Sequence, residues 1–394
     1  MSSMQTDLDW LIVGGGVHGT YLSNMLLQRA HVPRERLRVL DPNELPLASF
    51  FQCAEATGMR YLRSPVVHHL ELDPYALRRF GRSGPGRKTA RFFYPYERPG
   101  LAFFRQHVEF VVAKHRLGEL RIRSRAQSIR RVPFGYSVET EHGQLTTRKL
   151  VLALGLGEQL CRPAWAKPLA GSPSVQHLFD PAFSRSSLTG VGKVLIVGGG
   201  ISAAQLACSL SSQGVEVQIL ARHQPRVFRF DSEPEWLGPR AMERFGQASD
   251  PGLRRAMIRE ARHRGSMPGE VATALRAELR LGRVQWLETE IVSSSVGADG
   301  VSLWRSGESA PLLGQRVVLA TGFELHRPGG KMVDEAVASL GLACGSCGYP
   351  LVSRRLEWAP GLFVSGPLSE LELGPSARNI AGARSAGERL LAVA

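Results

Sequence analysis

The sequence predicts an α/β protein with two parallel β-sheets, each flanked by helices, and a small β-meander. Three observations support this fold class. A short pattern of apolar strand, glycines and helix occurs twice, as IVGGGVHGTY from residue 12 and as IVGGGISAAQLA from residue 196. In both copies a second apolar run follows the helix, as in a parallel sheet. The 394 residues, 43% of them hydrophobic, are enough to bury one large core or two ordinary ones.

The first copy has the order strand, glycine-rich turn and helix. Residues 11–13 form a short apolar run typical of a buried parallel strand, and Gly14, Gly16 and Gly19 follow in the spacing G-x-G-x-x-G. The first glycine permits a tight turn, the second lets a pyrophosphate approach the backbone, and the third lets the helix expected over 20–28 pack close to the strand. The free N–H groups at the start of that helix favour a phosphate. This pattern predicts a Rossmann-like dinucleotide-binding site.

A carboxylate stands at the end of the next predicted strand. Residues 37–40 form this strand and Asp41 follows it, about 20 residues after the last glycine of the pattern. A carboxylate at this place accepts hydrogen bonds from the ribose hydroxyls of an adenosine. We therefore expect Asp41 to bind the cofactor together with the three glycines.

The second copy has the same order of elements with one changed residue. An apolar strand over 194–197 precedes Gly198 and Gly200, and Ala203 stands in the place of the third glycine. A helix is expected over 203–211. The chain therefore contains a second candidate dinucleotide site.

The second copy lacks the acidic residue. After the strand expected over 215–220, Arg222 occupies the corresponding region. An arginine there pairs with the 2′-phosphate of NADP, which a carboxylate would repel. We therefore expect Gly198, Gly200 and Arg222 to bind NADPH rather than NADH, and the alternative is an arginine that only faces solvent.

The chain has a dinucleotide site with an acidic residue near the N-terminus and a second site with an arginine further along. Flavoproteins that hold both FAD and NADPH have this arrangement. Ser202 and Ala203 belong to VGGGISAAQ, which is close to the G-x-G-Q-S-A-A-E motif of class B flavoprotein monooxygenases. Residues 319–323, LATGF, are similar to the ATG-aromatic signature that leads from the NADPH domain back to the FAD domain. The match covers most of the chain. The sequence therefore resembles the class B flavoprotein monooxygenases, nearest to their lysine and ornithine N-hydroxylase branch.

The resemblance implies two Rossmann-like domains, of which the first is interrupted by the second. It implies an FAD-binding domain over 1–165 and 325–394, with the meander over 120–147, and an NADPH-binding domain over 190–324. A helical insert over 224–283 lengthens the NADPH domain and is expected to be a lid or a packing element.

Further cofactor contacts are expected at turns. The resemblance implies that turn residues after strands and before the last helix contact FAD or NADPH: Gly155, Thr321, Gly322, Gly366 and Gly374. The last helix opens after the segment 374–379 and runs to Leu391. The resemblance places it beneath the flavin, where its N-terminus stabilises negative charge on the reduced ring.

Two residues are candidates for the catalytic site. In the segment after the first βαβ unit, where related flavoproteins run a loop past the flavin, Arg60 is a candidate cofactor contact and Arg63 a candidate catalytic residue. His177 precedes the NADPH domain, where relatives place a histidine, and is a candidate for gating NADPH. The family's spacing around that histidine is absent, and Val17 and His18 replace the residues usual after the second glycine. Surface arginines and an ordinary linker histidine are the alternatives.

The resemblance implies an FAD-dependent, NADPH-consuming monooxygenase that oxygenates a nitrogen or sulfur centre of a small metabolite through a flavin C4a-hydroperoxide. Its partners would be a small-molecule substrate and molecular oxygen. A second hypothesis rests on Cys344 and Cys347, a C-x-x-C pair that can pass electrons to a disulfide. On this hypothesis the protein is an NADPH-dependent reductase of a disulfide, quinone or protein acceptor. A third hypothesis is a sensor that binds the dinucleotides without turnover.

Charge and composition argue against several other classes. The net charge is +14, but the basic residues are spread along the chain without interleaved aromatics, which argues against nucleic-acid binding. No apolar run approaches the roughly 18 residues of a membrane span, and the start of the chain lacks a basic region followed by an apolar segment. Five scattered cysteines argue against a disulfide framework, and no second pair completes a zinc site. We expect a cytoplasmic protein without a metal site, and the sequence leaves room for a homo-oligomer.

Overall fold

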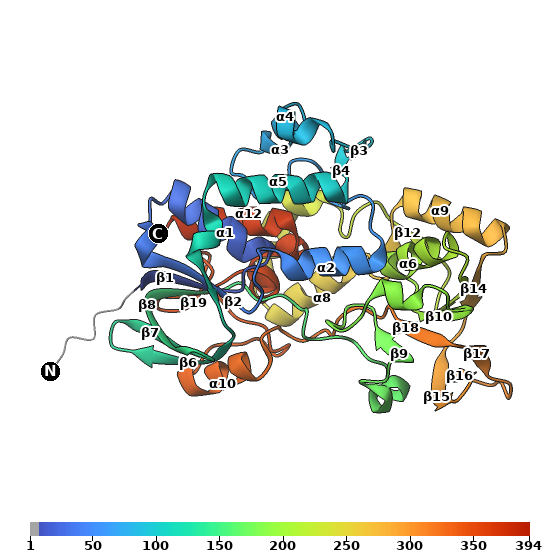
Figure 1. Cartoon of the computed structure of the whole chain (residues 1–394). Coiled ribbons are helices and arrows are strands. Elements are labelled where there is room, and N and C mark those ends of the chain that lie inside the picture. The colour runs from blue at the N-terminus through green and yellow to red at the C-terminus, as the bar shows by residue number, and fades with distance from the viewer. Residues whose placement is uncertain (1–7) are drawn as a thin grey trace.

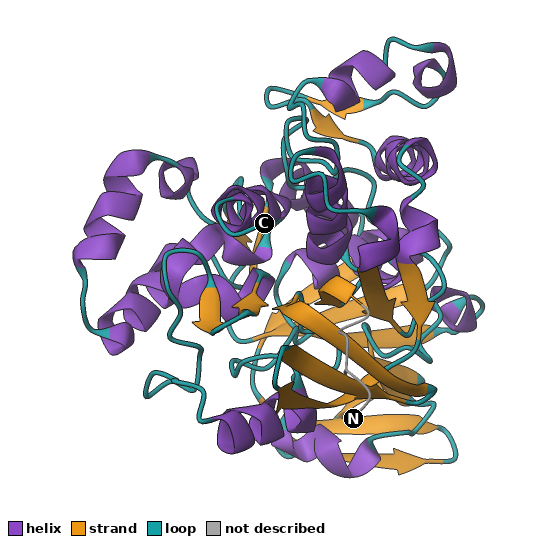
Figure 2. Ribbon diagram, turned by 90° about the vertical axis from the view of Figure 1, so that its left-hand side faces the viewer, coloured by secondary structure: helices purple, strands orange, loops and turns teal. Residues whose placement is uncertain are grey.

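Two β-sheets lie in different halves of the molecule, and helices cover their faces (Figure 1). The structure is a computed structural model that describes residues 8–394. In the turned view of Figure 2, most strands lie together and helices lie above and beside them. The predicted α/β fold class, with parallel sheets flanked by helices, is confirmed.

The first sheet contains the strands on both sides of the first glycine pattern. Its eight strands are β1 (Leu8–Val13), β2 (Leu37–Asp41), β5 (Arg121–Arg123), β6 (Ala126–Val132), β7 (Gly135–Thr140), β8 (Gly143–Leu152), β19 (Glu357–Ala359) and β20 (Leu362–Val364). The order is β19-β20-β8-β1-β2-β5, and β1 pairs in parallel with β2 and β8. The antiparallel strands β6, β7 and β8 form a meander in the region where the sequence predicts one.

The second sheet is entirely parallel and surrounds the second glycine pattern. Its strands are β9 (Val175–His177), β10 (Lys193–Val197), β11 (Glu216–Ala221), β14 (Val284–Glu288) and β18 (Arg316–Leu319), in the order β14-β11-β10-β18-β9. β9 pairs with β18, although it precedes residue 190, where the second domain is expected to start. The sheet therefore takes one strand from the segment before that boundary.

Three small sheets lie outside these two. They consist of β3 (Phe92–Phe93) with β4 (Arg98–Pro99), β12 (Arg226–Val227) with β13 (Ser266–Met267), and β15 (Ile291–Gly297) with β16 (Gly300–Arg305) and β17 (Leu312–Gly314). In Figure 1 the segment that carries β3 and β4 stands above the rest of the molecule.

The helices follow the periodic apolar segments of the sequence. The α-helices of the described residues are α1 (Val17–Gln28), α2 (Ala48–Thr57), α3 (Ala76–Phe80), α4 (Gly84–Arg87), α5 (Leu101–Lys114), α6 (Ile201–Ser211), α7 (Pro239–Gln247), α8 (Pro251–Ala261), α9 (Gly269–Arg280), α10 (Gly330–Leu340), α11 (Glu370–Leu373) and α12 (Ile380–Leu391). Short 3-10 helices are η1 (Arg34–Arg36), η2 (Leu117–Leu120), η3 (Ala164–Leu169), η4 (Arg185–Leu188), η5 (Pro234–Leu237), η6 (Gly366–Ser369) and η7 (Pro375–Arg378).

Each sheet has its own apolar core. Trp10 and Phe363 are buried between the first sheet and helices that include α1 and α12, which pack on one another. Leu206 and Val217 are buried between the second sheet and helices α6 and α9. This burial of one face of each helix supplies the main driving force for forming both halves.

The helical insert packs against the C-terminal segment instead of standing free. The side chain of Glu370 in α11 is fully buried and lies 2.7 Å from Nη1 of Arg255 in α8. Arg378 of η7 donates from Nη2 to the same carboxylate at 2.8 Å, and Nη1 of Arg262, which ends α8, lies 3.8 Å from it. A single buried carboxylate thus holds three guanidinium groups from two distant parts of the chain. The geometry makes the insert a packing element.

We predict that Glu370→Gln strongly destabilises the protein. The substitution leaves the largely buried guanidinium groups of Arg255 and Arg378 without their carboxylate, whereas Arg262 keeps Asp231. Breaking a buried ion pair in this way costs about 3–5 kcal/mol. Urea unfolding measures the change in the free energy of unfolding. The control is Glu260→Gln on the exposed face of α8, which makes no ion pair within the described residues and should change stability by less than about 0.5 kcal/mol. Equal stability of the two variants would contradict the prediction.

Several histidines are buried in the neutral form. Burial lowers the pKa of His18, His69 and His177 to about 4 and that of His107 to about 3. His107 lies edge-on to the rings of His69 and Phe80, with centroids 5.1 and 5.2 Å apart. Protonation of these rings is therefore linked to unfolding.

We predict that the protein loses stability as the pH falls from about 6.5 to about 4. In this window the unfolded histidines, with a pKa of 6.5, bind protons that the folded ones do not, so their contribution is complete above pH 6.5 and declines below it. Melting temperatures across this range measure the decline. His107→Leu should make the melting temperature depend less steeply on pH. His142→Gln on an exposed turn should leave the steepness unchanged. A flat profile in the wild-type protein would overturn the prediction.

Candidate functional site

The first glycine loop has the geometry of a phosphate-binding turn. Gly14 has φ of +107°, and a Cβ there would clash with the carbonyl oxygen of Ala153. A Cβ on Gly19 would clash with the carbonyl oxygen of Gly14, so the helix lies close to the strand. Gly16 faces open space and caps α1 without a side-chain hydrogen bond. The first N–H groups of α1 are therefore open to a phosphate.

Asp41 lies at the end of β2, beside this loop. Its Oδ2 accepts a hydrogen bond from the N–H of Gly15 at 2.6 Å, and its Oδ1 accepts one from the N–H of Asn43 at 2.8 Å. Arg121, at the start of β5, lies 3.3 Å from the carboxylate and donates to the carbonyl of Asn43 at 2.7 Å. The carboxylate is thus held beside the phosphate turn as half of an ion pair.

Sequence reasoning missed Arg121. Its guanidinium lies against Gly15, so a side chain at that position would require the guanidinium to move. Burial lowers the pKa of Arg121, and Asp41 opposes that shift. Its only sequence signal is the alternation of basic residues along β5, which the structure brings next to β2.

The second glycine loop repeats the first with a different neighbour. Gly198 has φ of +135°, and a Cβ there would clash with the carbonyl oxygen of Ala320. Gly200 caps α6 without a side-chain hydrogen bond, and Ser202 lies in the first turn of that helix. Ala203, in the third glycine position, is fully buried in the core of the second sheet. The loop therefore offers open helical N–H groups, as the first one does.

Arg222 follows directly after β11, as the sequence predicts. Its side chain is exposed and makes no hydrogen bond or ion pair with any described residue. The adjacent His223 donates from Nδ1 to the carbonyl of Gln224 at 2.8 Å, and its ring lies against Gly199. The guanidinium of Arg222 is therefore free to bind an anion at the second loop.

The chain crosses between the two halves at two adjacent places. The N–H of Cys161 donates to the carbonyl of Gly322 at 2.9 Å, and the hydroxyl of Thr321 donates to the carbonyl of Cys161. Gly155, which leaves the first sheet, is exposed and faces open space. Thr321 and Gly322 thus link the two connecting segments by hydrogen bonds to Cys161. They follow the carboxyl end of β18, which is the end of the sheet where the second glycine loop lies.

The C-terminal turns meet the first glycine loop. Nδ1 of His18 lies 2.8 Å from Oγ of Ser365, and its ring faces Gly366. Gly374 lies beside Met242 of α7. Asn379 caps α12 without a side-chain hydrogen bond, so the first N–H groups of this helix are also open to a ligand.

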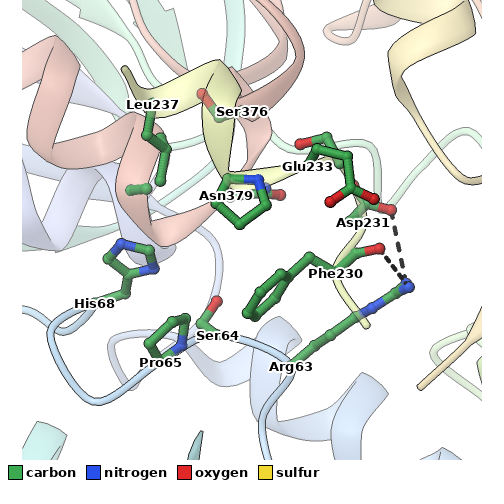
Figure 3. A pocket seen from close by; sticks show the side chains of 13 residues that line it. Arg63, Ser64, Pro65, His68, Phe230, Asp231, Glu233, Leu237, Ser376 and Asn379 are labelled. Carbon is green, nitrogen blue, oxygen red and sulfur yellow. Dashed lines mark hydrogen bonds and ion pairs between the residues drawn. The ribbon is translucent and has the colours of Figure 1, made fainter. Parts of the chain in front are cut away.

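A cavity of about 130 Å³ lies where three segments meet (Figure 3). The loop after α2 supplies Ser64, Pro65 and His68, the insert supplies Phe230 and Leu237, and the start of α12 supplies Asn379. Burial lowers the pKa of His68 to about 4, so its ring is neutral at pH 7. The cavity is therefore lined mainly by apolar and neutral polar groups at the N-terminus of α12.

The candidate residues Arg63, Arg60 and His177 lie in three different places. Arg63 lines the cavity and donates from Nη2 to the carbonyls of Phe228 and Phe230 at 2.7 and 2.6 Å, which ties its loop to the insert. Arg60 is exposed and does not line the cavity. His177 is buried in β9, where its Nδ1 accepts the N–H of Phe179 at 3.1 Å, and it does not line the cavity either.

The C-x-x-C pair is not part of the cavity wall. Cys344 and Cys347 are free thiols between α10 and β19, and neither lines the cavity. Burial raises the pKa of the Cys344 thiol, and Cys347 packs against an apolar cluster that contains Tyr349. A protonated, packed thiol is a weak nucleophile.

Two further properties hold for residues 8–394. No helix in this part of the chain is long and apolar enough to cross a membrane. No three histidine, cysteine or acidic side chains of these residues lie close enough together to bind one metal ion.

Two family models match the chain. A model of pyridine nucleotide-disulphide oxidoreductases matches residues 91–264, and a model described as FAD-NAD(P)-binding matches residues 11–157. No curated protein sequence matches the chain. The second model begins in β1 and covers the first glycine loop and Asp41, which are the residues that the sequence predicts as a dinucleotide site.

Solved structures share the fold over nearly all of the chain. The ornithine hydroxylase from Pseudomonas aeruginosa has a TM-score of 0.76 at 17% identity, covering 98% of both chains. The L-lysine 6-monooxygenase from Pseudomonas syringae has a TM-score of 0.72 at 17% identity, again covering 98% of both. The bacillithiol disulfide reductase from Bacillus cereus has a TM-score of 0.62 at 16% identity, covering 99% of this chain and 98% of that one.

The predicted resemblance is confirmed by the family models, the solved structures and the two glycine loops. Both loops have the backbone geometry that a pyrophosphate requires, and the carboxylate of Asp41 lies beside the first loop. The chain is therefore an FAD- and NAD(P)-binding oxidoreductase that shares the fold of ornithine and lysine N-hydroxylases and other flavin monooxygenases.

Proposed function

We propose that the protein is an FAD-dependent, NADPH-consuming monooxygenase that oxygenates a nitrogen or sulfur centre of a small metabolite. In this reaction NADPH supplies two electrons and the solvent a proton, one oxygen atom enters the substrate, and the other leaves as water. We assign FAD to the half that contains the first sheet and NADPH to the half that contains the second. The five free thiols are compatible with a reducing compartment such as the cytoplasm.

The cavity at the start of α12 is the observation that carries this proposal. The chemistry that bound FAD supplies is acceptance of a hydride from NADPH and activation of molecular oxygen. Residues of the first glycine loop and Asp41 would hold its adenosine end, and the open N–H groups of α12 would stabilise negative charge on its reduced ring. The apolar side chains of Phe230 and Leu237 would exclude water from the substrate.

The charged side chains of the cavity are already paired. Asp231 forms an ion pair with Arg262 at 2.5 Å, and Glu233 lies 2.9 Å from Nε2 of His263. Arg63 is satisfied by carbonyl oxygens of the insert. Among the described residues that line the wall, no charged side chain lacks a partner, and the ring of His68 is neutral. This suits a reaction in which the cofactor makes the bond and the protein orients the substrate.

A disulfide, quinone or protein reductase is the second candidate. It is favoured by the match to the pyridine nucleotide-disulphide oxidoreductase model and by the likeness to the bacillithiol disulfide reductase. A disulfide reductase of the dithiol type needs a reactive thiol near its flavin. None of the five cysteines lines the cavity, and burial raises the pKa of Cys344. This placement favours the monooxygenase.

We expect the FAD-loaded protein to stabilise an oxygenated flavin. In stopped-flow absorbance, protein reduced by NADPH without oxygen and then mixed with oxygen should show, for seconds, a spectrum of neither reduced nor oxidised flavin. Replacing Cys344 and Cys347 by serine should not change it, because neither lines the cavity.

Other outcomes of this experiment would overturn the monooxygenase. A thiolate-to-flavin charge-transfer band that appears before oxygen and is lost in the serine variant would support the reductase. Immediate return to oxidised flavin with stoichiometric release of hydrogen peroxide would support reduction of another acceptor. Binding of both dinucleotides without any reduction of FAD would support the sensor.

We predict that Arg222 selects NADPH over NADH. Its free guanidinium lies after β11, where the 2′-phosphate of NADP is bound in this fold. Arg222→Ala should raise the KM for NADPH about tenfold and leave the KM for NADH unchanged, because a charge-assisted hydrogen bond contributes about 1.5–3 kcal/mol. Flavin reduction kinetics measure both constants. Arg226→Ala removes the same charge at an exposed site nearby and should change neither. An equal effect on both cofactors would contradict this role.

A further inference from the structure

A turn of the helical insert lies beside the second glycine loop. Arg264 and Gly265 lie between α8 and β13, and β13 holds this turn by pairing with β12. The Cα of Gly265 lies 3.4 Å from the position that a Cβ on Gly200 would take. The ring of His223 lies 2.9 Å from the position of a Cβ on Gly265. The insert therefore forms a second wall beside the glycine at which a pyrophosphate approaches the backbone.

Arg264 is an unpaired cation in this wall. Its exposed side chain makes no hydrogen bond or ion pair with any described residue, although it lies among other arginines. Burial, Arg262 and Arg378 all lower the pKa of Arg264. Arg262 and Arg378 have their own carboxylates in Asp231 and Glu370, but Arg264 has none.

An unpaired guanidinium among like charges favours an anionic ligand. Two arginines that border the second glycine loop are free, Arg222 after β11 and Arg264 in the insert, and both act electrostatically on Cys161 at the crossing between the halves. The two occupy different places. Arg222 stands at the adenosine ribose end of the motif, whereas Arg264 adjoins Gly265, which faces Gly200.

We infer that Arg264 binds the pyrophosphate of the nicotinamide dinucleotide. The insert thus completes the second dinucleotide site, with Arg264 facing the group that NADPH and NADH share and Arg222 facing the group that only NADPH carries. This inference rests on the proposed function, because it takes the second glycine loop as the nicotinamide dinucleotide site.

The test is the affinity of FAD-loaded protein for NADP⁺ and NAD⁺, measured by titration calorimetry, so that no turnover is needed. Arg264→Ala should lower the affinity for both ligands by a similar factor of about ten, because a charge-assisted hydrogen bond to a phosphate is lost in both complexes. Arg222→Ala should weaken NADP⁺ alone. Arg276→Ala removes the same charge from the exposed face of α9 and should weaken the binding of neither ligand.

Each remaining outcome is decisive. The pyrophosphate assignment is wrong if the Arg264→Ala variant has wild-type affinity for both ligands. It is also wrong if the variant loses affinity for NADP⁺ alone. Unchanged FAD content and melting temperature show that a loss of affinity is not a loss of fold. A wild-type protein that binds neither ligand would contradict the proposed function itself, whereas tight binding without oxygenation would leave the role of Arg264 standing and overturn only the monooxygenase.

Discussion

The buried carboxylate of Glu370 is the interaction on which the arrangement of the site depends. It lies in the segment before α12 and holds Arg255 and Arg262 of the insert as well as Arg378. Arg262 also pairs with Asp231, which lines the cavity. Because an unpaired buried charge is costly, the insert cannot leave this segment without a large loss of free energy. The ion pairs therefore keep the insert, which forms one wall of the cavity, against the first helical turn of α12.

The same glycine motif occurs in two different structural surroundings. At the first loop Gly16 faces open space, and Arg121 pairs with the carboxylate beside the turn. At the second loop Gly200 faces Gly265 of the insert, and no carboxylate follows the strand. Backbone geometry makes both loops suitable for a pyrophosphate, whereas the charges around each loop suit different dinucleotides. Two copies of one motif can thus bind an electron donor and an electron acceptor in one chain.

The cavity has few groups that could exchange protons. His68 is neutral because burial lowers its pKa, and the acidic side chains of the wall have partners. Arg63, a candidate catalytic residue from the sequence, uses its guanidinium to hold the backbone of the insert. In the cavity wall it thus ties the loop after α2 to the insert. Such a wall suits a reaction in which the protein orients a substrate and excludes water.

The sequence by itself determined the fold class and both glycine loops, because the apolar runs, the glycine spacing and Asp41 act within about 30 residues of chain. It also predicted the free arginine after β11. Only the tertiary structure placed Arg121 over Gly15, Arg264 beside the second loop, and Glu370 among three guanidinium groups. These contacts join residues far apart in the chain, and no local spacing encodes which strand or helix packs beside another. For the same reason the sequence could not show that His177 is buried in β9, away from the cavity.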